Sequence, residues 1–222
     1  LTAVRPAPVG RRERHKAAKL ERIHEAARRL FGKKGFERTS IKEIAEVADV
    51  AVGTVFLYAK SKEDLLVMCF RDEVGEAIAE AFRTVPRAPL LDQVMHVFEV
   101  MISHNVANLE LARVFTREIP FAVGARHGVK EVMDAFHHRM QELIERGQQA
   151  GEIAPDVSPA MLGHTLWAVY FHFLLRWLGS GRRSPESLQP TLRDMIAVPL
   201  AGFRLPTAKK SRERRRRTEN RP

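Results

Sequence analysis

The sequence predicts an all-α fold of about nine helices, on two observations. Apolar residues recur every three or four positions through nearly the whole chain, which is the spacing of a helix face that packs on a core. No stretch of useful length alternates apolar and polar residues as a half-buried strand does. The chain has 222 residues, of which 45% are apolar and 29% charged, so it can bury a substantial core and is not disordered throughout.

Four helices are expected in the N-terminal part. The first covers 16–32, where apolar residues follow the helical period up to a glycine. The second, at 40–47, opens with Ser-x-x-Glu, a capping box in which each end satisfies a free amide of the other. We expect this helix to be short, because residues 48–50 are typical of a turn. The third covers 52–58, and a second serine-led cap opens the fourth, 61–85, which ends ahead of two prolines.

The helical period continues through the rest of the chain. Apolar stripes predict five further helices, over 91–102, 111–115, 129–144, 158–178 and 184–203. Pro159 stands at the favoured first position of one of them. Pro199 should bend or end the last, because a proline nitrogen has no hydrogen to donate.

One segment has the length of a membrane span. Residues 159–178 number twenty, which is enough to cross a bilayer. They include His164, His172 and Arg176, which would be costly in lipid. A helix that is apolar nearly all round is otherwise buried in a core or against a partner subunit. We therefore expect this helix to be buried, and the protein to be soluble with no membrane partner.

Positive charge is concentrated at the ends of the chain, whose formal net charge is +10. Residues 1–20 hold six Lys/Arg against one acid, and residues 204–222 hold nine against two. The segment 21–62 is also net basic, whereas 63–203 is mildly acidic. Basic regions of this kind suggest a polyanion as partner, most commonly nucleic acid. Terminal charge runs are about as often no more than solvated tails.

No enzyme or metal site is predicted. The sequence lacks a glycine-rich phosphate loop, a Gly-x-Ser-x-Gly elbow and a His-Glu-x-x-His pair. His137 and His138 are adjacent, and His164 and His172 are eight apart, so neither pair has the spacing of a two-ligand clamp. We expect no catalytic residue, no metal and no cofactor, while an undetected activity of the larger domain stays open. Cys69 is the only cysteine, which fits a reducing cytosol and a cytoplasmic protein.

The first sixty residues predict a helix-turn-helix. Two short helices joined by a tight turn follow a longer helix inside a basic segment. In such a motif the second short helix enters the major groove of DNA and presents its N-terminal residues to base edges. Gly53 is a poor helix former, and it is tolerable where a bare backbone must approach DNA or a neighbouring helix. An accidental helical hairpin in a bundle is the alternative.

Residues 22–66, RIHEAARRLFGKKGFERTSIKEIAEVADVAVGTVFLYAKSKEDLL, carry a resemblance to a known family. The matches are Ala26-Ala27, Leu30-Phe31, Gly35-Phe36, Thr39-Ser40, Ile44-Ala45, Val50, Gly53-Thr54, Ser61-Lys62-Glu63 and Leu65-Leu66. With these residues at fixed spacing, the segment resembles the DNA-binding domain of TetR-family transcriptional regulators. In the remaining chain the resemblance is architectural only.

The resemblance implies a set of DNA-contacting residues. They are Thr39 and Lys42 at the start of the first motif helix, Val52, Gly53, Thr54 and Phe56 on the recognition helix, and Tyr58 and Lys62 at phosphates. Ile44, Ala45, Val50 and Val55 look like the core of the motif. Three residues depart from the family pattern: Ala51 cannot cap the recognition helix, Phe56 lacks a hydroxyl, and Ala59 replaces a common aromatic residue.

The resemblance also implies a sensor. A small molecule would enter a cavity in the larger domain and move two DNA-binding heads apart, in a homodimer that is formed through the last two long helices. The candidate lining residues are Phe98, Met101, His104, Asn105, Phe115, Phe121, Met133, Phe136, His137, Met140, Trp167, Tyr170 and Phe171. Each is individually more often ordinary core. Because Arg and Lys are sparse on these stripes, we expect an apolar or aromatic effector.

The expected domains are a basic flexible arm (1–15), a helix-turn-helix domain (16–64), a ligand-binding and dimerisation domain (65–203) and a basic disordered tail (204–222). Arg11, Arg12 and Arg14 of the arm could reach a minor groove. Two hypotheses follow. The first is a ligand-responsive regulator, a repressor that binds a pseudo-palindromic operator in double-stranded DNA. The alternative is a sequence-indifferent, chromosome-associated protein that binds DNA through its basic tails.

Overall fold

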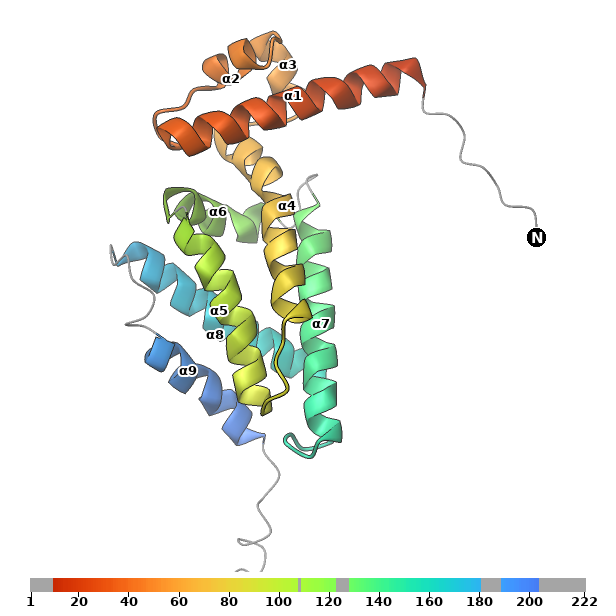
Figure 1. The fold of residues 1–222 in the computed structure, drawn as a ribbon, viewed down its shortest axis with the longest axis vertical. Coiled ribbons are helices and arrows are strands. Elements are labelled where there is room, and N and C mark those ends of the chain that lie inside the picture. Colours follow the sequence, from red (N-terminus) through yellow and green to blue (C-terminus); the bar gives the residue numbers. More distant parts are fainter. Residues whose placement is uncertain (1–9, 108, 123–127, 181–188, 204–222) are drawn as a thin grey trace, which may run out of the picture. The chain divides into compact units, whose positions relative to one another are not determined.

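The structure is a computed structural model that describes residues 10–107, 109–122, 128–180 and 189–203, without the side chains of residues 121, 122, 189 and 190. Within these residues the chain forms nine helices and no strands (Figure 1). The all-α prediction is confirmed. The helices are α1 (Arg11–Lys34), α2 (Ile41–Val47), α3 (Val52–Phe56), α4 (Lys62–Arg83), α5 (Leu90–Ala107), α6 (Leu109–Ala122), α7 (Val129–Gln149), α8 (Pro159–Gly179) and α9 (Gln189–Gly202).

Helix α1 begins five residues earlier than the sequence predicts. Arg11, Arg12 and Arg14 therefore belong to the helix, and the expectation that they form a flexible arm is wrong. Gly10 precedes the helix, and the sequence has no further glycine or proline before Gly32. An acid in the first turn also favours helix formation there, because its charge stabilises the positive end of the helix dipole. The rest of the expected arm, 1–9, lies outside the described residues.

Helices α2 and α3 differ in how they begin. Ser40 and Glu43 form the predicted capping box at the start of α2. Ala51 precedes α3 without any side-chain cap, as its methyl group requires. Between the two helices Asp49 adopts φ 51°, a left-handed conformation that lets the chain turn sharply. The helix-turn-helix geometry thus follows from one strong cap and one tight turn.

Pro199 does not end the last helix. Helix α9 continues to Gly202, although the proline nitrogen cannot donate to the carbonyl four residues earlier. Leu200, which is 1% exposed, anchors this final turn in the core. The amide of Ala154 donates to the carbonyl of Phe203 over 2.9 Å and ties the helix end down. Residues 184–188 of the predicted helix, like the expected tail 204–222, lie outside the described part.

The chain forms two compact units, and each consists of two stretches of sequence. The first unit comprises Leu1–Glu76 and His104–Val132, and the second comprises Ala77–Ser103 and Met133–Pro222. This division rests on compactness, so the functional boundaries at 64 and 203 stay a prediction. No described helix is long and apolar enough to cross a membrane.

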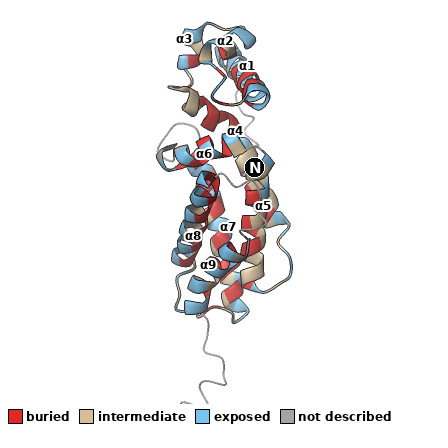
Figure 2. Ribbon diagram, turned by 90° about the vertical axis from the view of Figure 1, so that its left-hand side faces the viewer, coloured by how far each residue is buried: buried red, intermediate tan, exposed pale blue. Residues whose placement is uncertain are grey.

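Each unit has its own apolar core, which Figure 2 shows as buried faces on the helices. In the first unit, Ile23 of α1, Ile44 of α2 and Val55 of α3 have no exposed surface. The rings of Phe31 and Phe36 lie 5.4 Å apart, centre to centre, and close the end of α1 against the loop that follows. Helix α2 packs on α1 and α3 packs on α2, and the outer face of α3 stays free.

Candidate functional site

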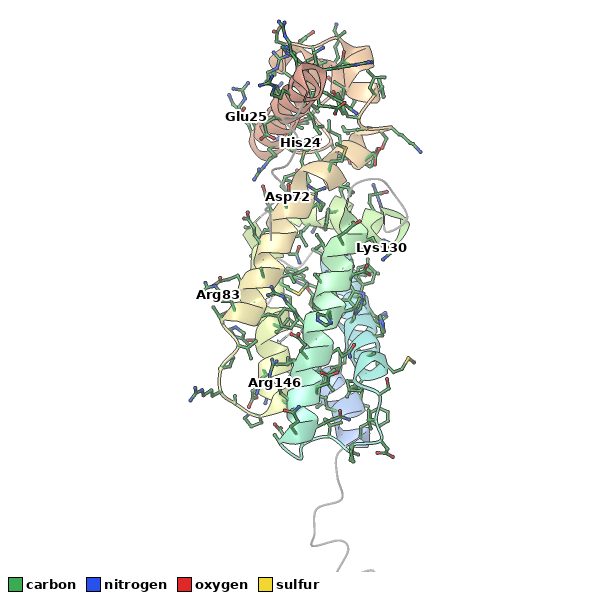
Figure 3. The ribbon with its side chains drawn as sticks, turned by 90° about the vertical axis from the view of Figure 1, so that its right-hand side faces the viewer. His24, Glu25, Asp72, Arg83, Lys130 and Arg146 are labelled. Atoms are coloured by element: carbon green, nitrogen blue, oxygen red, sulfur yellow. The ribbon has the colours of Figure 1, made fainter. Side chains whose placement is uncertain are left out.

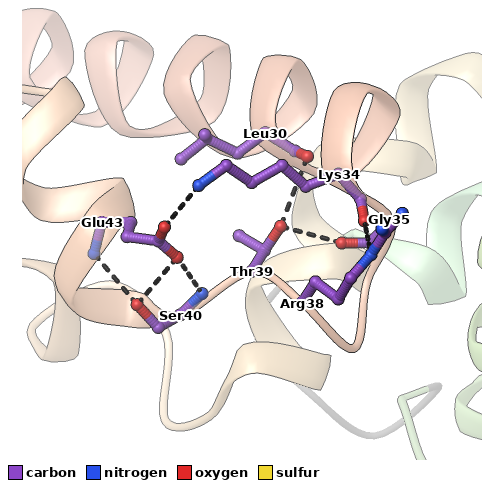
Figure 4. Close-up of polar contacts among 7 residues, drawn as sticks. All are labelled: Leu30, Lys34, Gly35, Arg38, Thr39, Ser40 and Glu43. Carbon is purple, nitrogen blue, oxygen red and sulfur yellow. Dashed lines mark hydrogen bonds and ion pairs between the residues drawn. The ribbon is translucent and has the colours of Figure 1, made fainter.

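The loop between α1 and α2 is fixed by polar contacts (Figure 4). Ser40 Oγ accepts the amide of Glu43 over 3.2 Å, and the amide of Ser40 donates to Glu43 Oε2 over 2.9 Å. Lys34 Nζ donates to Glu43 Oε1 over 2.5 Å. The bond from Lys34, followed by those from Ser40, lowers the pKa of Glu43 to about 2. The start of α2 is therefore held by an ionised carboxylate at any ordinary pH.

Thr39 lies inside this loop rather than on the surface. Its side chain is 2% exposed, and Oγ1 donates to the carbonyls of Leu30 and Gly35, at 3.3 and 2.8 Å (Figure 4). The hydroxyl therefore joins α1 to the loop and does not reach the surface in this structure. The DNA contact expected of Thr39 is corrected to a structural role, because a threonine hydroxyl that is buried must bond inside the protein.

The outer face of α3 is open to solvent. Val55 is fully buried and Ala59, four residues on, is 2% exposed, so this side of the turn packs on the core. On the opposite side Val52 is 39% exposed and Phe56 51% exposed. Gly53 is exposed between them, and no atom outside its own helix comes within 4 Å of the Cβ position there. This face can approach another molecule closely.

The other predicted DNA-binding residues are placed differently. Lys42 is exposed in the first turn of α2, and Thr54 of α3 is half-buried. Tyr58 donates its hydroxyl to the carbonyl of Lys16 over 3.2 Å, which ties the end of the motif to α1. Lys62 donates to the carbonyls of Phe36 (2.9 Å) and Glu37 (3.4 Å).

The ammonium of Lys62 also lies 4.2 Å from the ring centre of Phe36, in a cation–π contact. Three N–H groups are available to a lysine, so the two carbonyls leave one that can face a phosphate. The structure therefore gives Lys62 a structural function, and its phosphate contact stays a prediction.

Two features of this part of the structure were not predicted from the sequence. Leu57 is 80% exposed beside Phe56, although leucine usually predicts core. Its position four residues after Gly53, away from Val55 and Ala59, was the signal that could have revealed it. The second feature is long-range. Glu110 of α6 accepts the amide of Glu37 over 3.2 Å, a contact across 73 residues that no local spacing can reveal.

Helix α1 contacts α4 within the first unit through polar and charged side chains. Arg28 of α1 pairs with Glu73 of α4. Figure 3 shows His24 on the side of α1 that faces α4, with Glu25 on the other side of the helix and Asp72 on α4. Burial is the main cause that lowers the pKa of His24, and its Nε2 is buried without a hydrogen-bond partner.

The predicted sensor residues are divided between the two units. Nine of them belong to the second unit, where Phe98, Met101, Met133, Phe136, Met140 and Tyr170 are buried and His137, Trp167 and Phe171 are half-buried. His104, Asn105 and Phe115 belong to the first unit, and they line a cavity of about 80 Å³ that Phe70 and Leu111 also line. Phe121 lies in α6, but its side chain is outside the described part.

In the second unit, rings from α5, α7 and α8 form one aromatic group. Phe98 stacks on Tyr170 with ring centres 4.4 Å apart, and Phe136 lies 4.9 Å from Trp167. The Tyr170 hydroxyl is buried without a partner, and burial raises its pKa. His137 Nδ1 is likewise unpartnered, and burial, followed by the charge of His164, lowers the pKa of His137. The group thus combines a large apolar surface with two polar atoms that lack partners.

The chain matches family models over most of its length. Residues 23–69 match the model for bacterial regulatory proteins of the tetR family, and residues 88–198 match the tetracyclin repressor-like C-terminal domain. Among curated proteins, the fatty acid metabolism regulator protein of Bacillus subtilis is 23% identical over 167 residues, which cover 74% of this chain and 86% of that protein. The described residues hold no group of three His, Cys, Asp or Glu side chains that could bind a metal.

Crystal structures of known proteins share the fold. Thermus thermophilus FadR in complex with lauroyl-CoA has a TM-score of 0.65 at 25% identity, over 85% of this chain and 97% of that one. Bacillus subtilis FadR in complex with stearoyl-CoA has a TM-score of 0.63 at 20% identity, over 82% of this chain and 98% of that one. With both halves of the chain matched and a helix-turn-helix in place, the chain belongs to the tetR family of bacterial regulatory proteins, which are DNA-binding regulators of transcription.

Proposed function

We propose that this protein is a ligand-responsive repressor that binds a palindromic operator as a homodimer and is released by a small molecule. One observation carries the proposal: the large apolar side chains exposed among the described residues fall into two groups. One group lies on the helix-turn-helix and comprises Val47, Val52, Phe56 and Leu57. The other lies on or beside α8 and α9 and comprises Met161, Leu175, Val198 and Phe203. Exposed apolar groups of this kind mark interaction surfaces.

The first group suits contact with DNA. Val52 and Phe56 can pack on thymine methyl groups and sugars in the major groove, while Gly53 lets the backbone come close. Thr54 supplies a hydroxyl that can read a base edge, and Lys42 is positioned to contact a phosphate. Base contacts from α3 would give specificity, and phosphate contacts most of the affinity.

The second group suits a second copy of the chain. Met161, His164, Ala168 and Leu175 are exposed and recur at three, four and seven residues, so they form one stripe along α8. Val198 of α9 is 72% exposed. A two-fold dimer through these helices presents two recognition helices, and its operator is then an inverted repeat.

The aromatic group of the second unit is where we place the apolar part of the effector. Phe98, Phe136, Trp167 and Tyr170 supply apolar surface, and the unpartnered Tyr170 hydroxyl is a polar handle for a ligand. The ligand in the Thermus thermophilus FadR crystal, lauroyl-CoA, carries a long apolar chain, which makes acyl thioesters the first class to test. A ligand of this kind releases DNA only if it binds better to the conformation that cannot bind the operator.

The proposal is tested by selecting bound duplexes from a random DNA library at near-physiological salt. Enrichment of one inverted repeat supports it and supplies the operator. Lauroyl-CoA and stearoyl-CoA are then titrated into the operator complex, with coenzyme A alone as the control. Release by an acyl-CoA but not by coenzyme A supports the effector class. DNA retention without any enriched sequence would overturn the regulator.

The alternative, a sequence-indifferent binder, has its own test. Removal of residues 1–9 and 208–222 deletes Arg5 and eight Lys/Arg of the C-terminal tail, and it leaves α1 and α9 whole. A regulator keeps its preference for the selected operator after this truncation. A protein that binds through its tails loses most DNA binding.

A further inference from the structure

Helices α8 and α9 pack on each other in the second unit, and each keeps one face exposed. The exposed face of α8 is the stripe that begins at Met161. On α9, Thr191, Asp194, Val198 and Ala201 are exposed and follow one another at steps of three and four residues, so they form a second stripe. The homodimer proposed above covers both faces, which we call the α8 stripe and the α9 stripe.

Apart from histidines, each stripe carries one charged side chain. Arg176 is exposed and lies eight residues after Ala168 and four after His172, so it belongs to the α8 stripe. Asp194 is exposed and lies four residues before Val198 on the α9 stripe. The two stripes of one chain are therefore opposite in charge, and a second copy of the chain offers each of them its complement.

Neither charge is paired within the described part of the chain. Arg176 and Asp194 make no hydrogen bond or ion pair with any described residue. The adjacent Arg193, by contrast, pairs with Asp92 of α5 over 2.5 Å, so its charge is already satisfied outside the α9 stripe. A charge that is covered without a partner is costly. An interface that covers both stripes therefore has to bring the two unpaired charges to partners.

The positions of the two charges suit a contact between chains. Arg176 lies in the last turn of α8, and it lines one pocket together with Thr191, which is three residues before Asp194. Both charges therefore lie at the same end of the α8–α9 pair. In a two-fold dimer in which these ends meet, Arg176 of one chain faces α9 of its partner. The contact then occurs twice, because such an interface uses every contact in both directions.

We propose that Arg176 of one chain forms an ion pair with Asp194 of the other across the homodimer interface. The proposal rests on the homodimer proposed above and names a contact that fixes its register. A guanidinium can bind a carboxylate at two points, which makes the pair directional. Two such pairs resist sliding of the helices along one another, and they favour a second copy of this chain over a partner that lacks either charge.

Charge reversal in the full chain tests the pair, with sedimentation velocity over a range of concentrations as the measurement. Arg176→Glu and Asp194→Arg each place like charges opposite one another in a homodimer. In a heterodimer of the two variants, the introduced glutamate meets the introduced arginine, and the native Arg176 meets the native Asp194. Arg139→Glu, at an exposed position of α7, makes the same change outside both stripes and is the control. Circular dichroism melts establish that every variant is folded.

We expect each reversal alone to weaken the dimer at least about thirtyfold, because like charges then oppose each other at two places. A one-to-one mixture of the two variants should dimerise within about threefold of the wild type, since both pairs are restored. Arg139→Glu should dimerise like the wild type.

Three outcomes would overturn the pair, and they differ in what they say of the homodimer. A dimeric wild type that neither reversal weakens would leave the homodimer standing without this contact. Weakening without rescue in the mixture would show that the charges act within one chain, because a second chain cannot restore a pair inside the first. A monomeric wild type would overturn the homodimer together with the pair.

Discussion

The hydroxyl of Thr39 bonds to two carbonyls at the end of α1, and the turn beside it is equally constrained. Gly35 has φ +82°, which side chains rarely adopt, and a Cβ there would lie 2.5 Å from Glu110 Oε2. Lys62 binds the neighbouring carbonyls from the other side. The side chain of Thr39 in the loop and those of Lys62 (α4) and Glu110 (α6) therefore set the position at which α2 begins, and residues predicted as DNA contacts also hold the fold together.

The capping box gives the first prediction at this scale. Ser40→Ala removes the side-chain acceptor for the amide of Glu43 and is expected to lower the free energy of unfolding by about 1 kcal/mol. The pKa of Glu43 should rise from about 2 part of the way toward its ordinary value, because the bond from Ser40 Oγ to Glu43 Oε2 (3.0 Å) is lost, while the bonds from Lys34 and from the amide of residue 40 remain. Chemical denaturation and an NMR titration of Glu43 measure the two effects. Ser103→Ala, at an exposed site inside α5, is the matched control and should change neither quantity.

The sign of the pH dependence follows from this shift. A carboxylate with a lowered pKa in the folded state adds stability above its unfolded pKa, here 4.5, and that stability is lost as the pH falls toward 2. The difference in stability between the wild type and Ser40→Ala should therefore shrink between pH 4.5 and pH 2. A difference that stays constant over this range would contradict the role assigned to Glu43.

Lys62 has a structural role and a predicted phosphate contact, and one variant tests both. Lys62→Ala should lower the unfolding free energy by about 1–2 kcal/mol, because two carbonyls and the face of Phe36 lose their cation. It should also reduce the salt slope of operator binding by about one unit, through the lost phosphate contact. Denaturation and binding at several salt concentrations test both parts. Lys60→Ala, at an exposed neighbouring site, should leave the stability unchanged.

Cys69 provides a test of packing between α1 and α4. It is 3% exposed, and burial raises its pKa to about 12. At pH 8 the native thiol is protonated and covered, so we expect it to react with a disulfide reagent such as DTNB only when the protein is unfolded. Rapid reaction of the native protein would show that this part of the core opens readily.

At the scale of elements, local signals predict helices well because the contacts that define them are local. The capping box at Ser40 and the missing cap at Ala51 could both be predicted from the sequence, because a cap joins residues that are three apart. The start of α1 could not be predicted in this way, because Gly10 has no side chain that could cap the helix. The sensor residues were predicted from helical spacing. Such spacing identifies the buried face of a helix, but it does not identify the unit in which that face is buried.

We expect that a substitution at Ala51 can give α3 the side-chain cap that it lacks. Ala51→Ser should add a side-chain acceptor at the N-terminus of α3 and raise the free energy of unfolding by about 1 kcal/mol, because the backbone at this position is already extended. Thermal and chemical denaturation measure the gain. Ala51→Val, which has no acceptor, should not stabilise the protein, and an equal effect of both substitutions would show that capping is not the cause.

At the scale of the whole molecule, the exposed stripe of α8 and the free face of α9 set the proposed assembly. Val198→Asp places a charge on the most exposed large apolar residue of these two helices and should weaken the homodimer by at least about a hundredfold, since a charge is costly to bury without a partner. Sedimentation velocity reports the change. Ala135→Asp adds the same charge to an exposed site on α7 and should leave the dimer intact. If Val198→Asp stays dimeric, the interface lies elsewhere.

The first unit is built from two stretches of chain, Leu1–Glu76 and His104–Val132. A genetic crossover just after α4 would therefore transfer α2 and α3 without α6. The amide of Glu37 would then lose the carboxylate of Glu110 unless the recipient protein supplied one. Exchange of whole N-terminal segments between diverged relatives is thus penalised by the architecture. Under the proposed function, new operators are more readily reached by single substitutions on the open face of α3, where Val52 and Phe56 are exposed and can change without disturbing the core.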